Sequence, residues 1–300
     1  MIYCLVTEVH AYTWRSFLRT WGSDFAGRMS VVPYGTILGK KRNWDRHGCY
    51  LFCDLDRLTL SARETLARLH AELRDLCGAE RVLNDPLHSL LRYDLLRTMH
   101  AVGINEFAVR RVNAHDVPAK FPLFLRSRHH QDASPVLITD AAAYRSAVGE
   151  LQRTGVPLDS LLAVDFCDVA DRGGVYRKYG AFVVGESIVP RHLFFGRQWV
   201  LRQADLEAPE LLAEELAYLE ANPHREALQR IARIAGVEYG RIDYGVLEGR
   251  PQVWEINTNP MIASRISAQI AARRDVHLGF LAMFARALEA LDAPAVRAPA

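Results

Sequence analysis

The feature that most constrains this fold is a pair of β-rich runs joined by a tight turn within residues 241–260. A turn over residues 248–250 predicts an antiparallel hairpin in which Asp243 lies directly across from Glu255. Directly opposed residues have Cβ atoms roughly 4.5–5.5 Å apart on one face of the pair. Because strand side chains alternate, Asn257 shares the face of Glu255.

This register predicts a metal site. Asp243, Glu255 and Asn257 would converge as three oxygen donors, with no basic residue between them. Two carboxylates at this distance repel one another unless a cation separates them. Mg²⁺ suits such a site, because it prefers oxygen ligands, takes few protein carboxylates and completes its shell with phosphate and water. We therefore expect these three residues to bind one or two Mg²⁺ ions, with Mn²⁺ as a substitute.

Two alternatives to the metal site are open. A four-residue turn would shift the pairing register by one residue and move Glu255 to the other face. The two acids could also be solvated surface charges beside a hairpin. Three apolar residues of the second run, Val253, Trp254 and Ile256, favour a strand that is at least half buried, and so favour the metal site.

Composition and charge exclude several classes of function. The chain has 300 residues, half of them apolar, and a net charge of +2, so a basic nucleic-acid-binding surface is not indicated. No run approaches the roughly 18 apolar residues of a membrane span. The five cysteines are odd in number and irregularly spaced, which predicts reduced thiols in a cytoplasmic protein. Cys49 and Cys53 with His47 could form a metal cluster, but Cys-Tyr-Leu-Phe-Cys is better explained as a buried strand.

Alternating strand and helix patterns predict a mixed α/β chain in two parts. Strands at 1–9 and 49–55, followed by a helix that Ser61 caps and Gly78 ends, predict a small N-terminal α/β domain over residues 1–83. For residues 84–300, the pattern first predicts a helix ending near 101, extended segments at 105–112 and 121–127, and a helix at 140–153 capped by Asp140. It then predicts strands at 161–167, 175–184 and 187–195, helices at 209–221 and 223–235, the hairpin, and a last helix at 276–292.

The string Glu-Ile-Asn-Thr-Asn-Pro at 255–260, with Asp243 about a dozen positions upstream across a hairpin, resembles the metal-binding end of the ATP-grasp ligases. That superfamily includes D-alanine–D-alanine ligase and glutathione synthetase. The order of elements is also similar, and the resemblance covers most of the chain from about 84 to 265. It implies an α/β (α+β mixed) fold that holds ATP between two antiparallel sheets, with a central lid subdomain at about 104–168 and a C-terminal metal-binding subdomain at about 169–292.

The resemblance also implies phosphate contacts. In the family, one cation from a helix and one from a strand touch the phosphates of ATP. Arg92, with Arg97 as a competitor, stands near the helix position, and Arg126 stands at the strand position, where Lys is usual. Arginine is chemically acceptable there, since a guanidinium binds phosphate oxygens bidentately. The Gly-rich loop of the family is replaced by residues 127–134, which contain no glycine, so Arg128 and two histidines could contact phosphate or substrate instead.

For the base and ribose, the family uses a hinge that follows a buried strand. The run at 161–167 corresponds to that strand, although a plain buried strand with a polar exit explains the run equally well. The residues that the resemblance implies are Asp165, Phe166 and Cys167 at the hinge, and Asp168 or Asp171 at the ribose.

Basic residues of the next strands reach the triphosphate or acyl phosphate in the family. The candidates for catalysis in this chain are Lys178, Arg191, His192 and Arg265. Strand alternation places Lys178 on one face and Arg177 on the other, although Lys178 could also be a solvated edge charge. Lys178 would offset charge on the transferred group, and the other three would orient the acceptor carboxylate or stabilise an oxyanion.

The activity implied is that of an ATP- and Mg²⁺-dependent carboxylate–amine ligase. Such an enzyme transfers the γ-phosphoryl group to a carboxylate, and an amine then attacks the acyl phosphate to form an amide or peptide bond. We expect small-molecule carboxylate and amine substrates, related to an amino acid or short peptide, with no nucleic-acid or membrane partner and a possible homodimer. A small-molecule kinase on the same scaffold and a non-catalytic nucleotide-binding protein are the alternatives.

Overall fold

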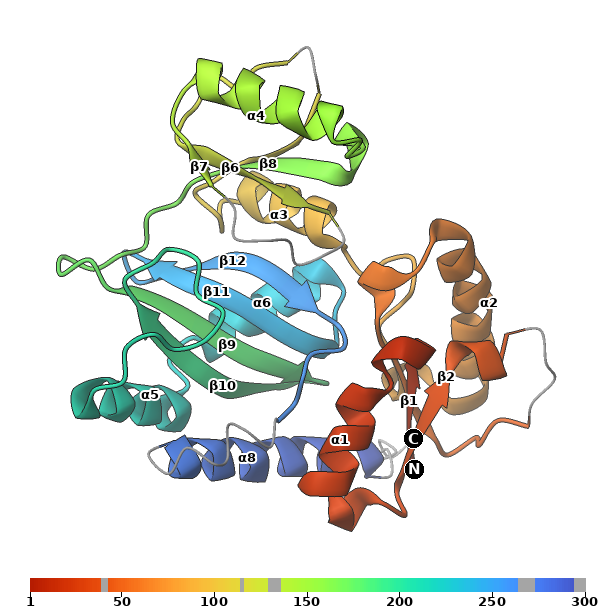
Figure 1. Cartoon of the computed structure of the whole chain (residues 1–300). Coiled ribbons are helices and arrows are strands. Elements are labelled where there is room, and N and C mark those ends of the chain that lie inside the picture. The colour runs from red at the N-terminus through yellow and green to blue at the C-terminus, as the bar shows by residue number, and fades with distance from the viewer. Residues whose placement is uncertain (39–42, 114–115, 129–135, 264–272, 294–300) are drawn as a thin grey trace.

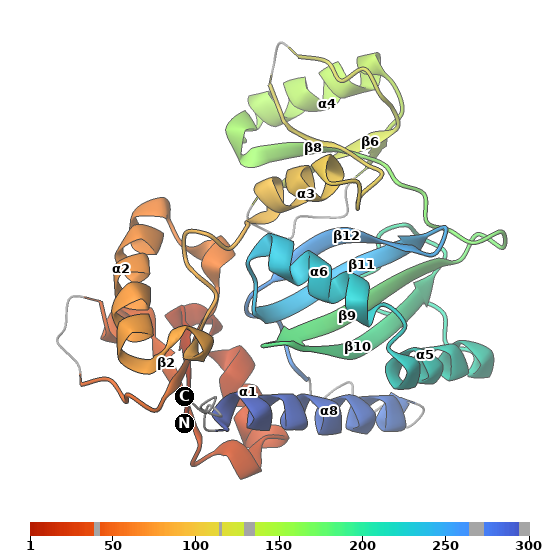
Figure 2. The same cartoon turned by 180° about the vertical axis from the view of Figure 1, so that it is seen from behind.

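The computed structural model describes residues 1–38, 43–113, 116–128, 136–263 and 273–293. These residues form three four-stranded sheets with helices packed on their faces, which is the mixed α/β architecture that the sequence predicts. Figures 1 and 2 show the first sheet beside the other two, which lie one above the other. The boundaries at residues 83 and 84 and within the second part remain predictions.

The first sheet is parallel and has the strand order β2-β1-β3-β4. Helix α2 packs on it through Leu66 and Leu73. The helix ends at Gly78 as expected, but its N-cap is Thr59, whose side chain accepts a hydrogen bond from the Ala62 N–H, so the predicted cap at Ser61 was wrong. The elements are β1 (Ile2–Val6), α1 (Tyr12–Thr20), β2 (Met29–Pro33), β3 (Cys49–Phe52), α2 (Leu60–Cys77) and β4 (Val82–Leu83).

The second sheet is antiparallel, in the order β5-β8-β6-β7, and lies between helices α3 and α4. Asp140 caps α4 as predicted, because its carboxylate accepts hydrogen bonds from two backbone N–H groups at 2.9 Å. The elements are α3 (Arg92–Ala101), β5 (Val109–Arg111), β6 (Leu123–Ser127), β7 (Leu137–Ile138), α4 (Ala141–Arg153) and β8 (Leu161–Asp165).

The third sheet is the largest and is also antiparallel, in the order β10-β9-β11-β12. Helices α3 and α6 pack on one face, and α5 and α8 pack against part of the other. The rest of that second face lies toward the second sheet (Figure 1). The elements are β9 (Tyr176–Val184), β10 (Ser187–Gly196), α5 (Pro209–Ala221), α6 (Arg225–Ala235), β11 (Tyr239–Leu247), β12 (Arg250–Asn257) and α8 (Arg274–Asp292).

The hairpin has the predicted pairing of the two acids, but its turn differs from the predicted one. Its turn contains only Glu248 and Gly249, both with positive φ (49° and 78°), as the tight turns of hairpins require. A two-residue turn alone would displace the two acids from one another. A β-bulge next to Asp243 corrects the register by passing over Trp254, and Asp243 then pairs with Glu255. The predicted three-residue loop was wrong, and the predicted opposition of the acids is confirmed.

The aromatic residues that follow the first strand join the two ends of the chain. Trp14 and Phe17 are buried against Phe284 of α8 at ring-centroid distances of 6.4 and 5.6 Å. The N-terminal ammonium also lies 2.6 Å from Asp292 at the end of that helix. This segment is therefore part of the main hydrophobic core.

Two further observations concern the expected environment of the protein. All five cysteines are free thiols, and Cys49 lies in the wholly buried strand β3, as the apolar run predicts. Among the described residues, no helix combines the length and the apolar character that a membrane span requires. The cytoplasmic location and the homodimer stay predictions.

Candidate functional site

A row of residues crosses the third sheet on the face toward the second sheet. His192 pairs with Gly180, Gly180 pairs with Asp243, and Asp243 pairs with Glu255. A Cβ at Gly180 would lie 2.5 Å from the ring of His192, so the glycine lets that ring lie over the backbone. The row therefore places two carboxylates and an imidazole on one surface.

Two cations neutralise Asp243. Arg241 binds both carboxylate oxygens, with Nε–Oδ1 at 2.6 Å and Nη2–Oδ2 at 2.9 Å, and Lys178 Nζ lies 3.1 Å from Oδ2. Burial alone raises the pKa of Asp243, but Arg241 and Lys178 outweigh burial and hold the pKa well below its usual range. The expectation that no basic residue lies between the oxygen donors was wrong, because Arg241, two residues before Asp243, shares its face.

Glu255 is neutralised from the opposite side of the site. Arg92 Nη2 lies 2.6 Å and Arg126 Nη2 lies 3.1 Å from Glu255 Oε2. Burial raises the pKa of Glu255, but these two guanidinium groups lower it further than burial raises it. Arg92 is the first residue of α3 and Arg126 lies in β6, the helix and strand positions that were predicted, whereas Arg97 is exposed on α3. Both carboxylates of the row are therefore ionised at neutral pH.

Asn257 ends β12 opposite Arg241. Its Oδ1 accepts a hydrogen bond from the Asn259 N–H at 2.8 Å, which fixes the amide at the end of the strand. Across the described part of the chain, no group of three or more His, Cys, Asp or Glu side chains is arranged as a metal site. The predicted ligand set has two carboxylates and one amide, so its role stays a prediction.

A cavity of about 390 Å³ lies between the second and third sheets, within the usual range for small-molecule sites of about 300–1,000 Å³. One end is charged and the other is apolar. The charged end includes Arg126, Lys178, Arg241, Asp243 and Glu255, and the apolar end includes Phe124, Val164, Phe166, Val169, Trp199 and Trp254.

Trp199 brings the apolar end together. Its ring lies 4.9 Å from that of Phe124 in the second sheet and 5.5 Å from that of Phe166, which follows β8. The loop that carries Trp199 returns to the end of β10, where the N–H groups of Asp205 and Leu206 both donate to the Phe195 carbonyl. These packed rings give the cavity an aromatic wall against which a planar, apolar ligand group can lie.

The charge balance of the other end favours an anion. The described lining of this cavity carries five cationic side chains and three carboxylates, an excess of two positive charges: Arg126, Arg177, Lys178, Arg202 and Arg241 against Asp165, Asp243 and Glu255. In a cavity walled by protein, such an excess attracts an anionic ligand strongly. The two ends together suit a ligand with a flat ring at one end and several negative charges at the other.

Comparison with known proteins agrees with this geometry. No protein-family model and no curated protein matches the sequence. Among solved structures, D-alanine–D-alanine ligase from Bacillus anthracis in complex with ATP matches with 13% identity over 97% of this chain and 98% of that chain, at a TM-score of 0.52. The RimK domain ATP-grasp protein from Sphaerobacter thermophilus matches with 15% identity over 95% and 98%, at 0.52. The ATP-grasp ligase PsnB with minimal precursor, Mg and ADP matches with 11% identity over 97% and 97%, at 0.53.

This chain has the ATP-grasp fold. The likeness extends over nearly the whole length of each protein, which confirms the resemblance that the hairpin residues carried.

Within the ATP-grasp fold, the predicted base and ribose residues separate into two groups. Asp165, Phe166 and Cys167 line the large cavity, and Asp165 also forms an ion pair of 2.6 Å with Arg110. The described lining does not include the two ribose candidates. They are held by local contacts instead: Asp168 accepts from the Ala170 N–H, and Asp171 pairs with Arg177, which lowers the pKa of Asp171 to about 2.

The predicted catalytic residues also differ in whether they line the large cavity. Lys178 lines the large cavity and lies 3.1 Å from Asp243, and Arg177, which also lines that cavity, pairs with Glu214 and Asp171. Arg191 lines neither of the described cavities; it is buried, its Nε donates to the Ile262 carbonyl, and its guanidinium lies 4.5 Å from the ring of Phe280. Burial lowers the pKa of Arg191 to about 9.

The last two candidates differ in what the structure says of them. His192 stacks on Phe194 with a centroid distance of 4.0 Å, and its Nε2 is buried with no hydrogen-bond partner in the described structure. Burial and the nearby Arg241 hold the pKa of His192 well below its ordinary value, so the imidazole is neutral at pH 7. Arg265 lies outside the described residues.

Sequence reasoning missed several residues that line the site, and Arg241 and Trp199 contribute most to it. Arg241 carried a usable signal, because strand alternation places it on the face of Asp243. Trp199 carried none, since it lies in an irregular loop and its neighbours in space come from other parts of the chain.

Proposed function

We propose that this protein is an ATP- and Mg²⁺-dependent ligase that joins a carboxylate to an amine through an acyl phosphate. The observation that supports this most is the charged end of the large cavity, where Asp243 and Glu255 lie between four cations in a chain with the ATP-grasp fold. Solved neighbours carry ATP in one case, and Mg and ADP in another.

The donor set fits magnesium. Asp243 and Glu255 are ionised because their pKa values are lowered, and Asn257 adds an amide oxygen at the end of the same strand pair. These hard oxygen ligands are the kind that Mg²⁺ takes, together with phosphate oxygens. When bound, the metal neutralises charge on the phosphates during transfer.

In the proposed function, the four cations that pair with the acids also bind the phosphates of ATP. Arg92 and Arg126 approach from α3 and β6, and Lys178 and Arg241 from the third sheet, so they surround the cavity's charged end. Phosphoryl transfer depends mainly on positioning and charge neutralisation, and guanidinium groups bind phosphate oxygens bidentately. These four residues would orient the triphosphate, while Phe124, Phe166 and Trp199 would hold the base.

The test is a measurement of ADP release with paired pools of carboxylates and amines. We expect the wild-type protein to need both pools and to form an amide. Glu255→Gln is expected to lower the rate by roughly a hundredfold or more, since even outer-shell partners of a metal cost about 10- to 100-fold when removed.

Glu106→Gln is the matched control, because Glu106 forms an exposed ion pair with Arg250 and does not line the large cavity. Equal rates for wild type and Glu255→Gln would remove Glu255 from catalysis. Phosphorylation of a single acceptor without an amide product would make the protein a kinase, and Mg-ATP binding without turnover would make it a non-catalytic binding protein.

A further inference from the structure

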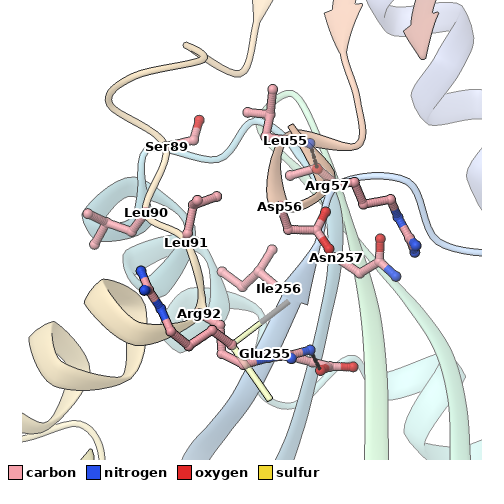
Figure 3. A pocket seen from close by; sticks show the side chains of 12 residues that line it. Leu55, Asp56, Arg57, Ser89, Leu90, Leu91, Arg92, Glu255, Ile256 and Asn257 are labelled. Atoms are coloured by element: carbon pink, nitrogen blue, oxygen red, sulfur yellow. Dashed lines mark hydrogen bonds and ion pairs between the residues drawn. The ribbon is translucent and has the colours of Figure 1, made fainter. Parts of the chain in front are cut away.

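A smaller cavity of about 150 Å³ lies beside the charged end of the large one. It is formed where four parts of the chain meet: residues 55–57 after β3, residues 89–92 at the start of α3, Arg128 just after β6, and residues 255–258 at the end of β12 (Figure 3). A cavity of about this volume holds a benzene-sized molecule, so on the order of six heavy atoms fit inside. Glu255 lines both cavities, which places the contents of the small one next to the proposed phosphates.

The wall contributed by the first sheet is held rigidly. Asp54 has a left-handed backbone with φ of 58°, a conformation that costs free energy for a residue with a side chain. Its buried carboxylate accepts hydrogen bonds from the Thr7 N–H at 2.9 Å and from Asn259 Nδ2 at 3.0 Å. The Leu55 N–H donates to Thr258 Oγ1 at 3.1 Å, which ties the same segment to the end of β12. The cavity is therefore preformed.

The acids around this cavity differ in whether a cationic side chain pairs with them. Glu255 pairs with Arg92 and Arg126, and Asp54 pairs with Arg57 at 3.3 Å. Asp56 forms no ion pair within the described residues, and its Oδ1 is buried without a hydrogen-bond partner there. Burial raises the pKa of Asp56, and the nearby Arg57 offsets only part of this effect. A buried carboxylate oxygen without a partner is costly, and a cationic donor would remove that cost.

We propose that this cavity binds the primary ammonium group of the nucleophilic substrate, with Asp56 Oδ1 as the acceptor. The proposal rests on the proposed ligase function, since it assigns the amine substrate to a place in that site. The volume limits the group to a small amine, such as the amino end of an amino acid or a peptide. Asn257 and Glu255 also line this cavity, so the ammonium would lie beside the proposed metal ligands (Figure 3).

The test uses ligand-observed NMR with a pool of amino acid amides, which carry a primary ammonium and no carboxylate. The same pool with N-acetylated amines serves as the uncharged probe, and both pools are measured with and without Mg²⁺ and a non-hydrolysable ATP analogue. The proteins are wild type, Asp56→Asn, Asp56→Glu, and Asp24→Asn, an exposed acid that lines neither described cavity.

We expect at least one free amine to bind the wild type and Asp24→Asn, and no acetylated analogue to do so. Asp56→Asn should weaken that binding by roughly 10- to 100-fold, because it removes a hydrogen bond to a charged group, and Asp56→Glu should retain part of it. Binding that is unchanged in Asp56→Asn, or a wild type that binds no amine, would overturn the proposal. Failure of the ligase proposal has a different signature, namely no amide product from the paired pools of carboxylates and amines, and the amine titration without nucleotide stays readable in that case.

Discussion

The two cavities of this protein share Glu255, but their acids differ in whether they have cationic partners. In the large cavity, Asp243 and Glu255 each contact two cations, and their pKa values are lowered. In the small cavity, Asp56 has no ion pair within the described residues, and burial raises its pKa. Burial acts in the same direction on all three acids, so the difference comes from the partners. The comparison indicates that the large cavity is prepared for an anion with its metal, whereas the small cavity, which Arg57, Arg92 and Arg128 also line, offers one open acceptor, Asp56 Oδ1, to a donor.

The largest expected effect is a loss of stability when the buried ion pair between Arg241 and Asp243 is broken. Arg241→Gln leaves Asp243 with Lys178 alone, and breaking a buried ion pair from one side typically costs about 3–5 kcal/mol. Chemical denaturation at pH 7 should show a loss of about 3 kcal/mol in the free energy of unfolding. Arg177→Gln, which removes a partly exposed arginine from the same sheet, should cost less than about 1 kcal/mol. Equal losses would show that burial does not distinguish the two pairs.

The second prediction concerns the pH dependence of stability. The folded-state pKa values of Asp243 and Glu255 lie below their unfolded values, so these groups stabilise the fold above about pH 4 and lose that contribution as pH falls through the folded values. The free energy of unfolding should therefore decrease from pH 5 to pH 3, by up to about 1.4 kcal/mol per pH unit for each group. Denaturation at several pH values measures this slope. Arg241→Gln should make the slope shallower, and an unchanged slope would argue against the ion pair as its cause.

The apolar end of the large cavity gives the third prediction. Trp199→Ala should weaken Mg-ATP binding by roughly tenfold, since stacking of a base on an aromatic ring contributes about 1–3 kcal/mol. Binding of magnesium tripolyphosphate, which has no base, should not change. Calorimetric titration measures both ligands, and Gln198→Ala, an exposed neighbour on the same loop, is the control. Equal weakening for both ligands would mean that Trp199 supports the loop and does not contact the base.

The smallest expected effect is a gain in stability. An acid with a raised folded-state pKa destabilises the fold once pH rises through its unfolded value, because the folded state holds the charge less well. Asp56→Asn should therefore raise the free energy of unfolding at pH 7, by roughly 1 kcal/mol, and the gain should disappear below about pH 4. Thermal or chemical unfolding at the two pH values measures it. A loss of stability at pH 7 would show that Asp56 is satisfied in the folded protein.

The hairpin shows which features of the fold sequence patterns can predict and which they cannot. Alternation and turn chemistry predicted that Asp243 faces Glu255, and the structure confirms it, although the turn is shorter and a bulge restores the register. A bulge follows from how a strand packs against its neighbours, so periodicity along one strand does not reveal it. Ser61 shows the same limit on a smaller scale, since Thr59 two residues earlier also carries a capping hydroxyl and the helix uses it.

The sequence by itself determined the order and type of most helices and strands and the face on which the two hairpin acids lie, because these depend on spacing within short segments of chain. Only the tertiary structure decided which charges meet. Arg92, Arg126, Lys178 and Arg241 reach the acids from four different elements, and Asp56 is left without an ion pair among the residues that the structure describes, although all five residues are equally visible in the sequence. The physical reason is that the interaction of two charges depends on their distance and burial, and both arise only when distant segments pack together.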